Sequence, residues 1–305
     1  MPKLSKKITL YLYQIAKKIQ MVGFGTQNEI TARNLLHKTI LDRFYDQKVG
    51  QEYGINLEQK KILIEQFKDV AIKIQTATSW IYYVILATEI FSIPKSRKGD
   101  IIECGCWKGG GTVILSIICD KVNRKLFVAD SFEGIPADDN SGNHFYTHLS
   151  VMGFYRKGMY DGTLPEVEEN IRNFGKIKVC RFIKGFYKDS LKNFSKPLVF
   201  AFLDIDLRSS FEDSVRYIWP NLLNESYLYT DDSCDMNVVK FWFDDAWWKK
   251  NLHIEAPGYV GSGCGLPINP DYSSLGYARK IINPNSSFKT ENWFDKGMRW
   301  MKKSK

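Results

Sequence analysis

Four aspartates that could bind a cation follow two short apolar runs of the chain. The first run is FLDID (Phe202–Asp206), and the second is Tyr227–Ser233, which carries Asp231 and Asp232. Short apolar runs bounded by polar turns are typical of buried parallel strands. Open α/β sheets bind their ligands at the carboxyl ends of such strands. We therefore expect these carboxylates to converge on one crevice.

Crowded carboxylates repel one another unless a cation lies between them or some of them are protonated. This group offers only oxygen ligands, which favours a hard divalent ion, Mg²⁺ before Zn²⁺. In a second interpretation, each aspartate caps the helix that follows its strand, because Asp is a preferred N-cap residue. In a third, Asp204-Ile205-Asp206 is a DxD motif that holds a metal and a nucleotide diphosphate.

A glycine-rich turn follows an earlier apolar run. That run ends at Glu103, and the segment Gly105–Gly111 (GCWKGGG) then opens a helix. Glycine lets the backbone pass close to a ligand and leaves helix amides pointing at it. The segment is not a GxGxxG dinucleotide fingerprint, because Trp107 stands at the second glycine position. An acid at Glu103 suits a ligand with an ammonium group, such as S-adenosylmethionine (SAM).

Two further positions could contact such a cofactor. Asp130 ends the next strand, where an acid commonly binds ribose hydroxyls. The structural alternative is a tight strand-to-helix turn with Asp130 as a cap. After the third strand, Gly185 is followed by Phe186 and Tyr187, and an aromatic ring there could stack on adenine or belong to the core.

A mainly parallel sheet has to bring these residues together. From Asp100 onward the chain alternates between strand and helix patterns. Strands are predicted at residues 100–105, 125–130, 178–185, 197–206 and 226–232. Helices are predicted at residues 109–122, 164–175, 209–223 and 236–250, with a closing β-hairpin over 254–282. Five such units in succession predict a doubly wound α/β sheet.

The amino-terminal part reads differently. Apolar residues recur at helical spacing over 35–45, 57–78 and 80–91. We therefore divide the chain into an N-terminal helical extension, residues 1–95, and a catalytic domain, residues 96–305. The loop over residues 131–162 is rich in glycine and aromatic residues, and we expect it to order over a ligand.

Composition limits which partners and which cellular compartment we expect for the protein. The chain has 305 residues and a formal net charge of +9, with the basic excess at its two ends. No nucleic-acid-binding motif accompanies that charge, so we expect no nucleic-acid partner. The basic helix predicted over residues 3–21 could lie on an anionic membrane, or pack on its own domain or a sister subunit. The six scattered cysteines read as free thiols of a cytoplasmic protein.

Taken together, six ordered motifs resemble the macrocin O-methyltransferase (TylF/MycF) family. They are ECGCWKGG, VADSFEGIP, LPEVEENIRNFG, IKGFYKDSL, LDIDLRSS and the late Asp231-Asp232 pair, over residues 99–233. The resemblance implies a class I methyltransferase fold and an enzyme that uses SAM and Mg²⁺ to methylate sugar hydroxyls. It also implies cofactor contacts at Glu103, Gly105, Trp107, Asp130 and Ser131, and metal ligands at Asp204, Asp231 and Asp232.

The functional expectation is therefore a metal-assisted O-methyltransferase acting on a sugar or a glycosylated small molecule, and working as a homo-oligomer. Asp206 is a reserve ligand, and the proton acceptor is Asp204 or a histidine of the 131–162 loop. The two histidines, His144 and His148, could equally face solvent. The remaining expected cofactor contacts are Gly109, Gly110, Phe132, Gly185 and Tyr187. The rivals are a DxD glycosyltransferase and a non-catalytic basic binding protein.

Overall fold

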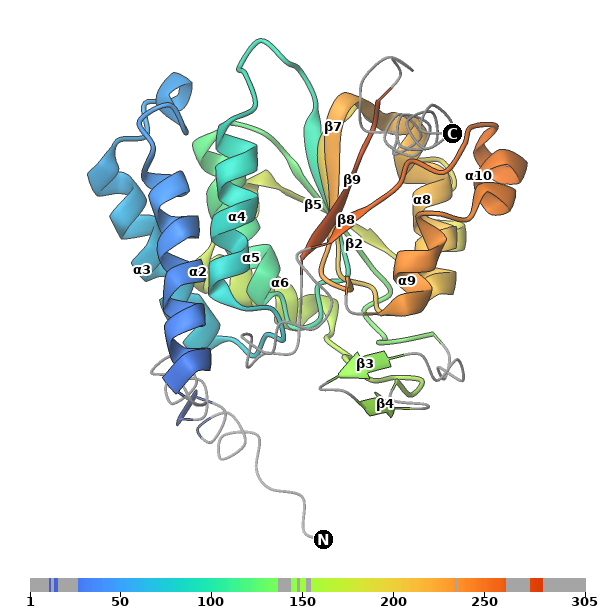
Figure 1. Ribbon diagram of the computed structural model, residues 1–305, viewed down its shortest axis with the longest axis horizontal. Helices are drawn as coiled ribbons and strands as arrows, with labels where there is room; N and C mark the ends of the chain where they lie inside the picture. Colours follow the sequence, from blue (N-terminus) through green and yellow to red (C-terminus); the bar gives the residue numbers. More distant parts are fainter. Residues whose placement is uncertain are drawn as a thin grey trace, which may run out of the picture.

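A twisted, mainly parallel sheet with helices on both faces organises the molecule (Figure 1). The computed structural model describes residues 27–136, 144–146, 149–151, 155–233, 235–261 and 275–281, together with Tyr11, Gln14 and Ile15. Within these residues the main sheet has the strand order β5-β2-β1-β6-β7-β9-β8. The strands are β1 (Asp100–Cys104), β2 (Leu126–Asp130), β5 (Cys180–Lys184), β6 (Leu198–Leu203), β7 (Leu222–Thr230), β8 (Val260–Gly261) and β9 (Gly276–Arg279).

The pairing of these strands places the functional edge. β1 pairs in parallel with both β2 and β6, so the chain order reverses on either side of β1. β5 continues the parallel sheet beyond β2, and β7 continues it beyond β6. β9 then runs antiparallel to both β7 and β8, which confirms the closing hairpin. This is the doubly wound, Rossmann-like sheet that the sequence predicted.

Helices cover the sheet in two groups. On one face lie α2 (Gln27–Tyr45), α3 (Leu57–Lys73), α4 (Trp80–Phe91), α5 (Gly110–Lys121) and α6 (Leu164–Phe174). On the other lie α7 (Tyr187–Ser190), α8 (Arg208–Asn221), α9 (Met236–Phe241) and α10 (Asp245–Leu252). Shorter elements are the 3₁₀ turns η1 (Gln51–Tyr53) and η2 (Ile177–Val179), and a separate hairpin of β3 (His144–Tyr146) and β4 (Leu149–Val151).

Strand alternation divides the core between the two faces. On β1, Ile101 belongs to the hydrophobic cluster under α3, α4 and α5, while Ile102 belongs to the cluster under α8, α9 and α10. Successive side chains of a strand point to opposite faces, so a strand buried on both sides needs apolar residues at nearly every position. That requirement explains the continuous apolar run Leu198–Leu203, which is buried throughout.

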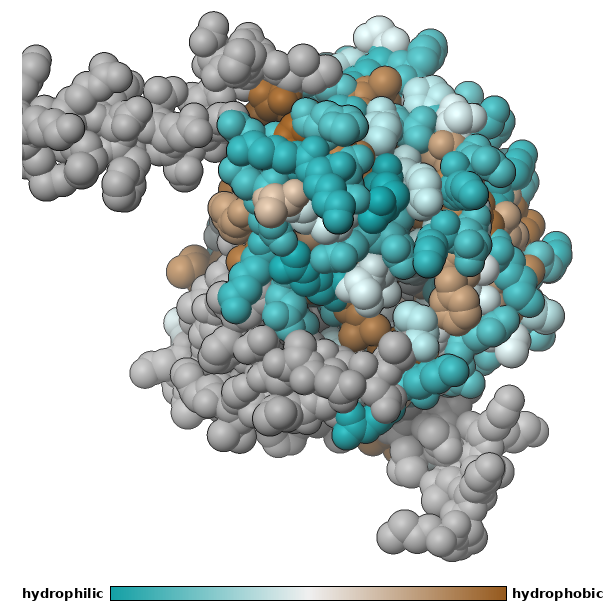
Figure 2. Space-filling model, turned by 90° about the vertical axis from the view of Figure 1, so that its right-hand side faces the viewer, coloured by the Kyte–Doolittle hydropathy of each residue, from teal (hydrophilic) through white to brown (hydrophobic). Residues whose placement is uncertain are grey.

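The predicted N-terminal extension is joined to this core. Phe67 of α3 and Val84 of α4 share one cluster with Val113 of α5 and with the sheet. In the described residues no helix combines the length and the apolar character needed to cross a membrane. Among the coloured residues, the face on the side of α8 and α10 is largely hydrophilic, with hydrophobic residues scattered among hydrophilic ones (Figure 2).

Three predicted boundaries are wrong. The helix predicted over 57–78 ends at Lys73, and residues 75–79 form a loop. The helix predicted over 236–250 is two helices, because Asp244 accepts a hydrogen bond from the Trp247 amide and so begins α10. The fifth strand begins at Leu222 rather than at 226, and it contains Glu225, whose φ is +63°.

Candidate active site

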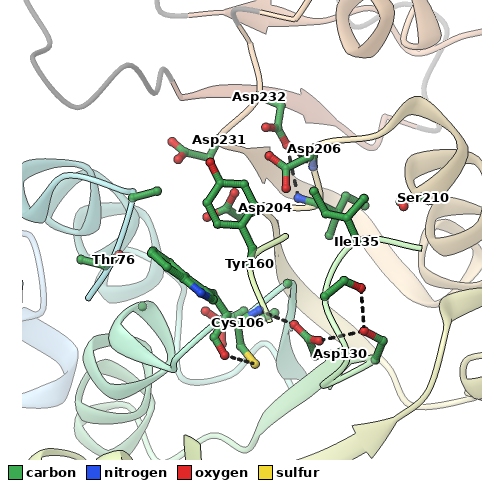
Figure 3. A pocket seen from close by; sticks show the side chains of 18 of the residues that line it. Thr76, Cys106, Asp130, Ile135, Tyr160, Asp204, Asp206, Ser210, Asp231 and Asp232 are labelled. Carbon is green, nitrogen blue, oxygen red and sulfur yellow. Dashed lines mark hydrogen bonds between the residues drawn. The ribbon is translucent and has the colours of Figure 1, made fainter. Parts of the chain in front are cut away.

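A cavity of about 520 Å³ opens at the carboxyl ends of β1, β2, β6 and β7 (Figure 3). Its walls come from the β1–α5 turn, the loop after β2, the ends of β6 and β7, and the loop that joins α3 to α4. The predicted crevice is therefore confirmed in position. The predicted residues that line it are Glu103, Gly105, Trp107, Gly110, Asp130, Ser131, Tyr187, Asp204, Asp206, Asp231 and Asp232.

The β1–α5 turn depends on the missing side chain of Gly105. Its φ is +84°, a conformation that favours glycine, and a Cβ there would lie 1.8 Å from the carbonyl oxygen of Asp204. The backbone of β6 passes this close because the Asp204 amide donates to the Cys104 carbonyl at 2.9 Å. Gly105 thus brings the end of β1 and the end of β6 into contact.

Glu103 is an acid buried at the cofactor end of the cavity. Its side chain is 1% exposed, and burial is the main cause that raises its pKa to about 8. Its Oε2 atom has no hydrogen-bond partner among the described residues. A buried carboxyl oxygen without a partner is costly, and a cationic ligand group would relieve that cost. The site therefore suits the ammonium group of an amino-acid moiety.

Asp130 joins the glycine turn to the end of β2. Its Oδ2 accepts a hydrogen bond from the Cys106 amide at 2.7 Å, and its Oδ1 accepts one from the Phe132 amide at 2.7 Å. Carboxylate oxygens have further lone pairs, so these bonds leave acceptor capacity facing the cavity. The predicted structural role of Asp130 and its predicted ligand contact are thus compatible.

Carboxylates gather at the opposite end of the cavity, and we call Asp204, Asp206, Asp231 and Asp232 the acidic cluster (Figure 3). Oxygens of Asp204, Asp206 and Asp232 lie within 4.8 Å of one another. Asp206 joins this group because its φ of +58° breaks the strand geometry. Burial, reinforced by neighbouring acids, raises the pKa of Asp204 to about 6 and that of Asp232 well above its ordinary value.

The capping interpretation of these aspartates is wrong. The N-cap of α8 is Leu207, and the N-cap of α9 is Asp235, which accepts a hydrogen bond from the Asn237 amide. Asp232 instead accepts hydrogen bonds from the amides of Ile205 and Asp206, at 3.3 and 3.1 Å. These bonds fix the end of β7 against the end of β6 and hold the cluster together.

Residues from the α3–α4 loop complete the acidic end. The Thr78 hydroxyl lies 3.0 Å from Oδ2 of Asp204 and 2.9 Å from Oδ2 of Asp231. Tyr83, at the start of α4, is hydrogen-bonded to Thr78, and its pKa is raised well above its ordinary value by burial and by Glu103. Sequence analysis missed both residues, because the helical pattern was extended through Thr78. The Thr-Ala-Thr-Ser run is the signal that the helix has ended.

The donor set fits a hard divalent ion. All the cluster's side chains offer carboxylate oxygens, and Asp204 and Asp232 belong both to the predicted ligand set and to the group within 4.8 Å.

Aromatic rings line the wall between the two ends. Trp107 and Tyr160 make an edge-to-face contact with ring centroids 5.2 Å apart, and Tyr155 lies 6.3 Å from Tyr160. Tyr160 stands next to the acidic cluster (Figure 3), and its pKa is raised first by burial and then by Asp206, Asp204 and Asp232. Tyr155 and Tyr160 lie in the segment before α6, where sequence analysis expected a closing loop.

Some predicted contacts lie elsewhere. Gly109 is the N-cap of α5, Phe132 packs against Phe182, and Gly185 donates its amide to the Asp130 carbonyl. Within the described residues, these three shape the walls rather than line the cavity. The backbone of His144 is in β3, but its side chain and all of His148 lie outside the described residues. Four cysteines are buried free thiols, namely Cys104, Cys106, Cys119 and Cys180.

Comparison with known proteins identifies the family to which the chain belongs. The family model described as "Macrocin-O-methyltransferase (TylF)" matches residues 92–257. That segment holds every sheet strand from β1 to β7 and all four aspartates of the acidic cluster. The chain belongs to the TylF family. Of the six TylF motifs, five contribute residues to the cavity wall, and LPEVEENIRNFG, which forms α6, does not.

Two curated relatives are similar to this TylF-family chain. Demethyldecarbamoylnovobiocin O-methyltransferase of Streptomyces niveus is 31% identical over 146 residues, covering 46% of this chain and 55% of the relative. The 8-demethyl-8-(2,3-dimethoxy-alpha-L-rhamnosyl)-tetracenomycin-C 4'-O-methyltransferase of Streptomyces olivaceus is 28% identical over 145 residues, covering 44% and 52%. The chain therefore spans about half the length of the curated relatives it matches.

Solved structures give weaker similarity. The O-methyltransferase NovP has a TM-score of 0.44 at 21% identity, covering 74% of this chain and 81% of its own. The calicheamicin methyltransferase CalS11 has a TM-score of 0.42 at 13% identity, covering 91% and 94%.

Proposed function

We propose that this protein transfers a methyl group from SAM to a hydroxyl of a sugar or of a glycosylated small molecule, with a divalent cation at the acidic cluster. One observation carries the proposal: a single cavity joins an acid-bearing glycine turn to a set of converging carboxylates. The names of the two curated relatives, both O-methyltransferases of glycosylated natural products, support the choice of acceptor class.

The cofactor end would hold SAM through Glu103, the Gly105–Gly111 turn and Asp130. SAM supplies a methyl group on a sulfonium centre, and the electron pair of the broken carbon–sulfur bond returns to sulfur. Glu103 would bind the ammonium group, and deprotonation of Glu103 accompanies that contact because its pKa in the free protein is about 8. The turn and Asp130 fix the cofactor's position, so that binding energy is used for alignment.

The acidic end would hold the acceptor. A Mg²⁺ ion there would lower the pKa of a bound hydroxyl and supply charge stabilisation to the developing oxyanion. Asp204 and Asp232 belong both to the ligand set that the family resemblance implies and to the group of oxygens within 4.8 Å, so we assign both as ligands. Asp206 and Asp231 are the candidates for a third ligand. Asp204, on the end of β6, is also the group we assign to accept the hydroxyl proton, while Tyr160 and Trp107 offer aromatic faces to a sugar ring.

Calorimetry and methyl-transfer assays test this proposal on the full chain. We expect SAH to bind in the absence of metal, and methyl transfer from SAM to a panel of glycosylated acceptors to require Mg²⁺. Comparison of Asp206→Asn with Asp231→Asn identifies the third ligand, since the true ligand's loss weakens Mg²⁺ binding more. Failure to bind SAH would overturn the proposed methyltransferase function. Binding of a UDP-sugar with Mn²⁺ in place of SAH would favour the DxD interpretation.

A further inference from the structure

The loop between α3 and α4 inserts one hydroxyl between two carboxylates of the acidic cluster. The Thr78 Oγ1 atom lies within hydrogen-bond distance of both Asp204 and Asp231, at 3.0 and 2.9 Å. Thr78 is 1% exposed and Asp231 is 3% exposed, so the contact between these two is shielded from water, whereas Asp204 is half-buried and lines the cavity. Thr78 lies outside residues 92–257, the part of the chain that the family motifs cover.

The single proton of the Thr78 hydroxyl limits which hydrogen bonds this group can donate. An ionised carboxylate accepts hydrogen bonds and cannot donate, whereas a threonine hydroxyl has one proton and two lone pairs. When both aspartates are ionised, the single Thr78 proton goes to Asp204 or to Asp231, and Tyr83 is a hydrogen-bond neighbour of the same hydroxyl. Tyr83 is 2% exposed, so this contact lies inside the core.

One proton cannot satisfy two carboxylates at once. Thr78 thus holds Asp204 and Asp231 close to a common point. Side chains that orient a metal's ligands typically change metal affinity by about 10- to 100-fold when they are removed.

From this geometry we infer that Thr78, held by Tyr83, is a positioning residue that prepares Asp204 and Asp231 for the divalent cation. The inference rests on the proposed function. It goes beyond it by assigning a role to the helical segment that precedes the family motifs. Thr78 acts through the two aspartates, and we assign it no contact with the reacting atoms.

The test measures metal binding rather than turnover. Mg²⁺ is titrated calorimetrically into the full chain saturated with SAH, and SAH affinity is measured on the same samples. We expect Thr78→Val, which removes the hydroxyl with little change of shape, to weaken Mg²⁺ on the order of tenfold and to leave SAH affinity unchanged. Thr78→Ser keeps the hydroxyl and should restore Mg²⁺ affinity.

Thr88→Val is the matched control. Thr88 lies on α4, is 3% exposed, and its hydroxyl donates to the Val84 carbonyl. The same loss of a buried hydroxyl there should leave Mg²⁺ affinity unchanged. Tyr83→Phe should weaken Mg²⁺ less than Thr78→Val does, and the double variant should bind no more weakly than Thr78→Val, because both hydroxyls act along one path.

Three outcomes would overturn the inference. One is an unchanged Mg²⁺ affinity in Thr78→Val, and another is an equal loss in Thr88→Val. The third is additive losses in the double variant. A wild-type protein that binds SAH but no divalent ion overturns the metal proposal instead, and the SAH titration on the same sample separates that result. If Thr78→Val loses SAH binding through misfolding, Tyr83→Phe with Thr78 intact decides the question.

Discussion

Glu103 shows how a single buried residue couples the cofactor end to pH. Burial raises its pKa from the ordinary 4.5 to about 8, so the folded protein keeps this proton over a range where the unfolded chain releases it. The stabilising effect of that proton is complete below pH 4.5 and is lost as pH rises through about 8. A glutamine side chain does not titrate in this range, so Glu103→Gln removes this pH dependence.

The first prediction follows from that titration. Between pH 5 and pH 8 the free energy of unfolding of the wild type should fall relative to that of Glu103→Gln, by up to about 1.4 kcal/mol per pH unit. Urea unfolding of both proteins at several pH values measures the difference. Parallel curves would show that Glu103 is ionised in the folded protein. SAH binding should also release a proton in the wild type and not in Glu103→Gln.

Gly105 gives the second prediction at this scale. An added Cβ would meet the Asp204 carbonyl at 1.8 Å in a backbone with φ of +84°, so Gly105→Ala should destabilise the protein by about 3 kcal/mol or more. Gly158 is the control, because its φ is +80° and an added Cβ there meets nothing within 4 Å. Gly158→Ala should cost about 1 kcal/mol, the backbone strain alone. Equal losses in urea unfolding would mean that the contact with β6 is unimportant.

At the scale of elements, the strands that carry the site could be predicted and the loop that completes it could not. Apolar runs ending at Glu103, Asp130 and Asp204 mark strand ends because a parallel strand is buried until it leaves the sheet. The end of α3 carries a weaker mark, since alanine, isoleucine and glutamine continue the helical pattern to Gln75 and only the Thr-Ala-Thr-Ser run after it favours a loop. Thr78 meets carboxylates through tertiary contacts that no local pattern records.

The third prediction concerns the helices that frame this loop. Asn56 begins α3 with a capping box, in which its side chain accepts from the Gln59 amide and the Gln59 side chain accepts from the Asn56 amide. Asn56→Ala should therefore lower the free energy of unfolding by about 1 kcal/mol. Ser79 is the N-cap of α4 but makes no side-chain capping bond, so Ser79→Ala should change the free energy of unfolding by less than about 0.5 kcal/mol. Unfolding curves that rank the two variants in the opposite order would contradict this assignment.

At the scale of the whole molecule, the cavity has two ends built from different parts of the sheet. β1 and β2 carry the cofactor end, and β6 and β7 carry the acidic end. The two ends meet where Gly105 contacts Asp204. Because they are built from different strands, we expect that ligand binding at one end can be lost while binding at the other end remains. Sequence analysis could place both ends, but the approach of Asp206 to Asp204 and Asp232 depends on its positive φ, which no pattern indicated.

That division yields the fourth prediction. EDTA should abolish methyl transfer and leave SAH binding nearly unchanged, and Asp204→Asn should do the same at saturating Mg²⁺. Glu103→Gln should do the reverse, weakening SAH while Mg²⁺ still binds. Calorimetry with each ligand separates the effects. Loss of both ligands in either variant would show that the ends form one cooperative unit.

The two bonds of Thr78 also have a consequence for the order in which the chain folds. Thr78 contacts Asp204 and Asp231, which lie 126 and 153 residues further along the sequence. Closing such long loops costs entropy that nothing local repays, so contacts of this kind form late. During synthesis, α3 and α4 leave the ribosome long before β7. Binding of the proposed cation would therefore report that the last parallel strand, β7, has been added to the sheet.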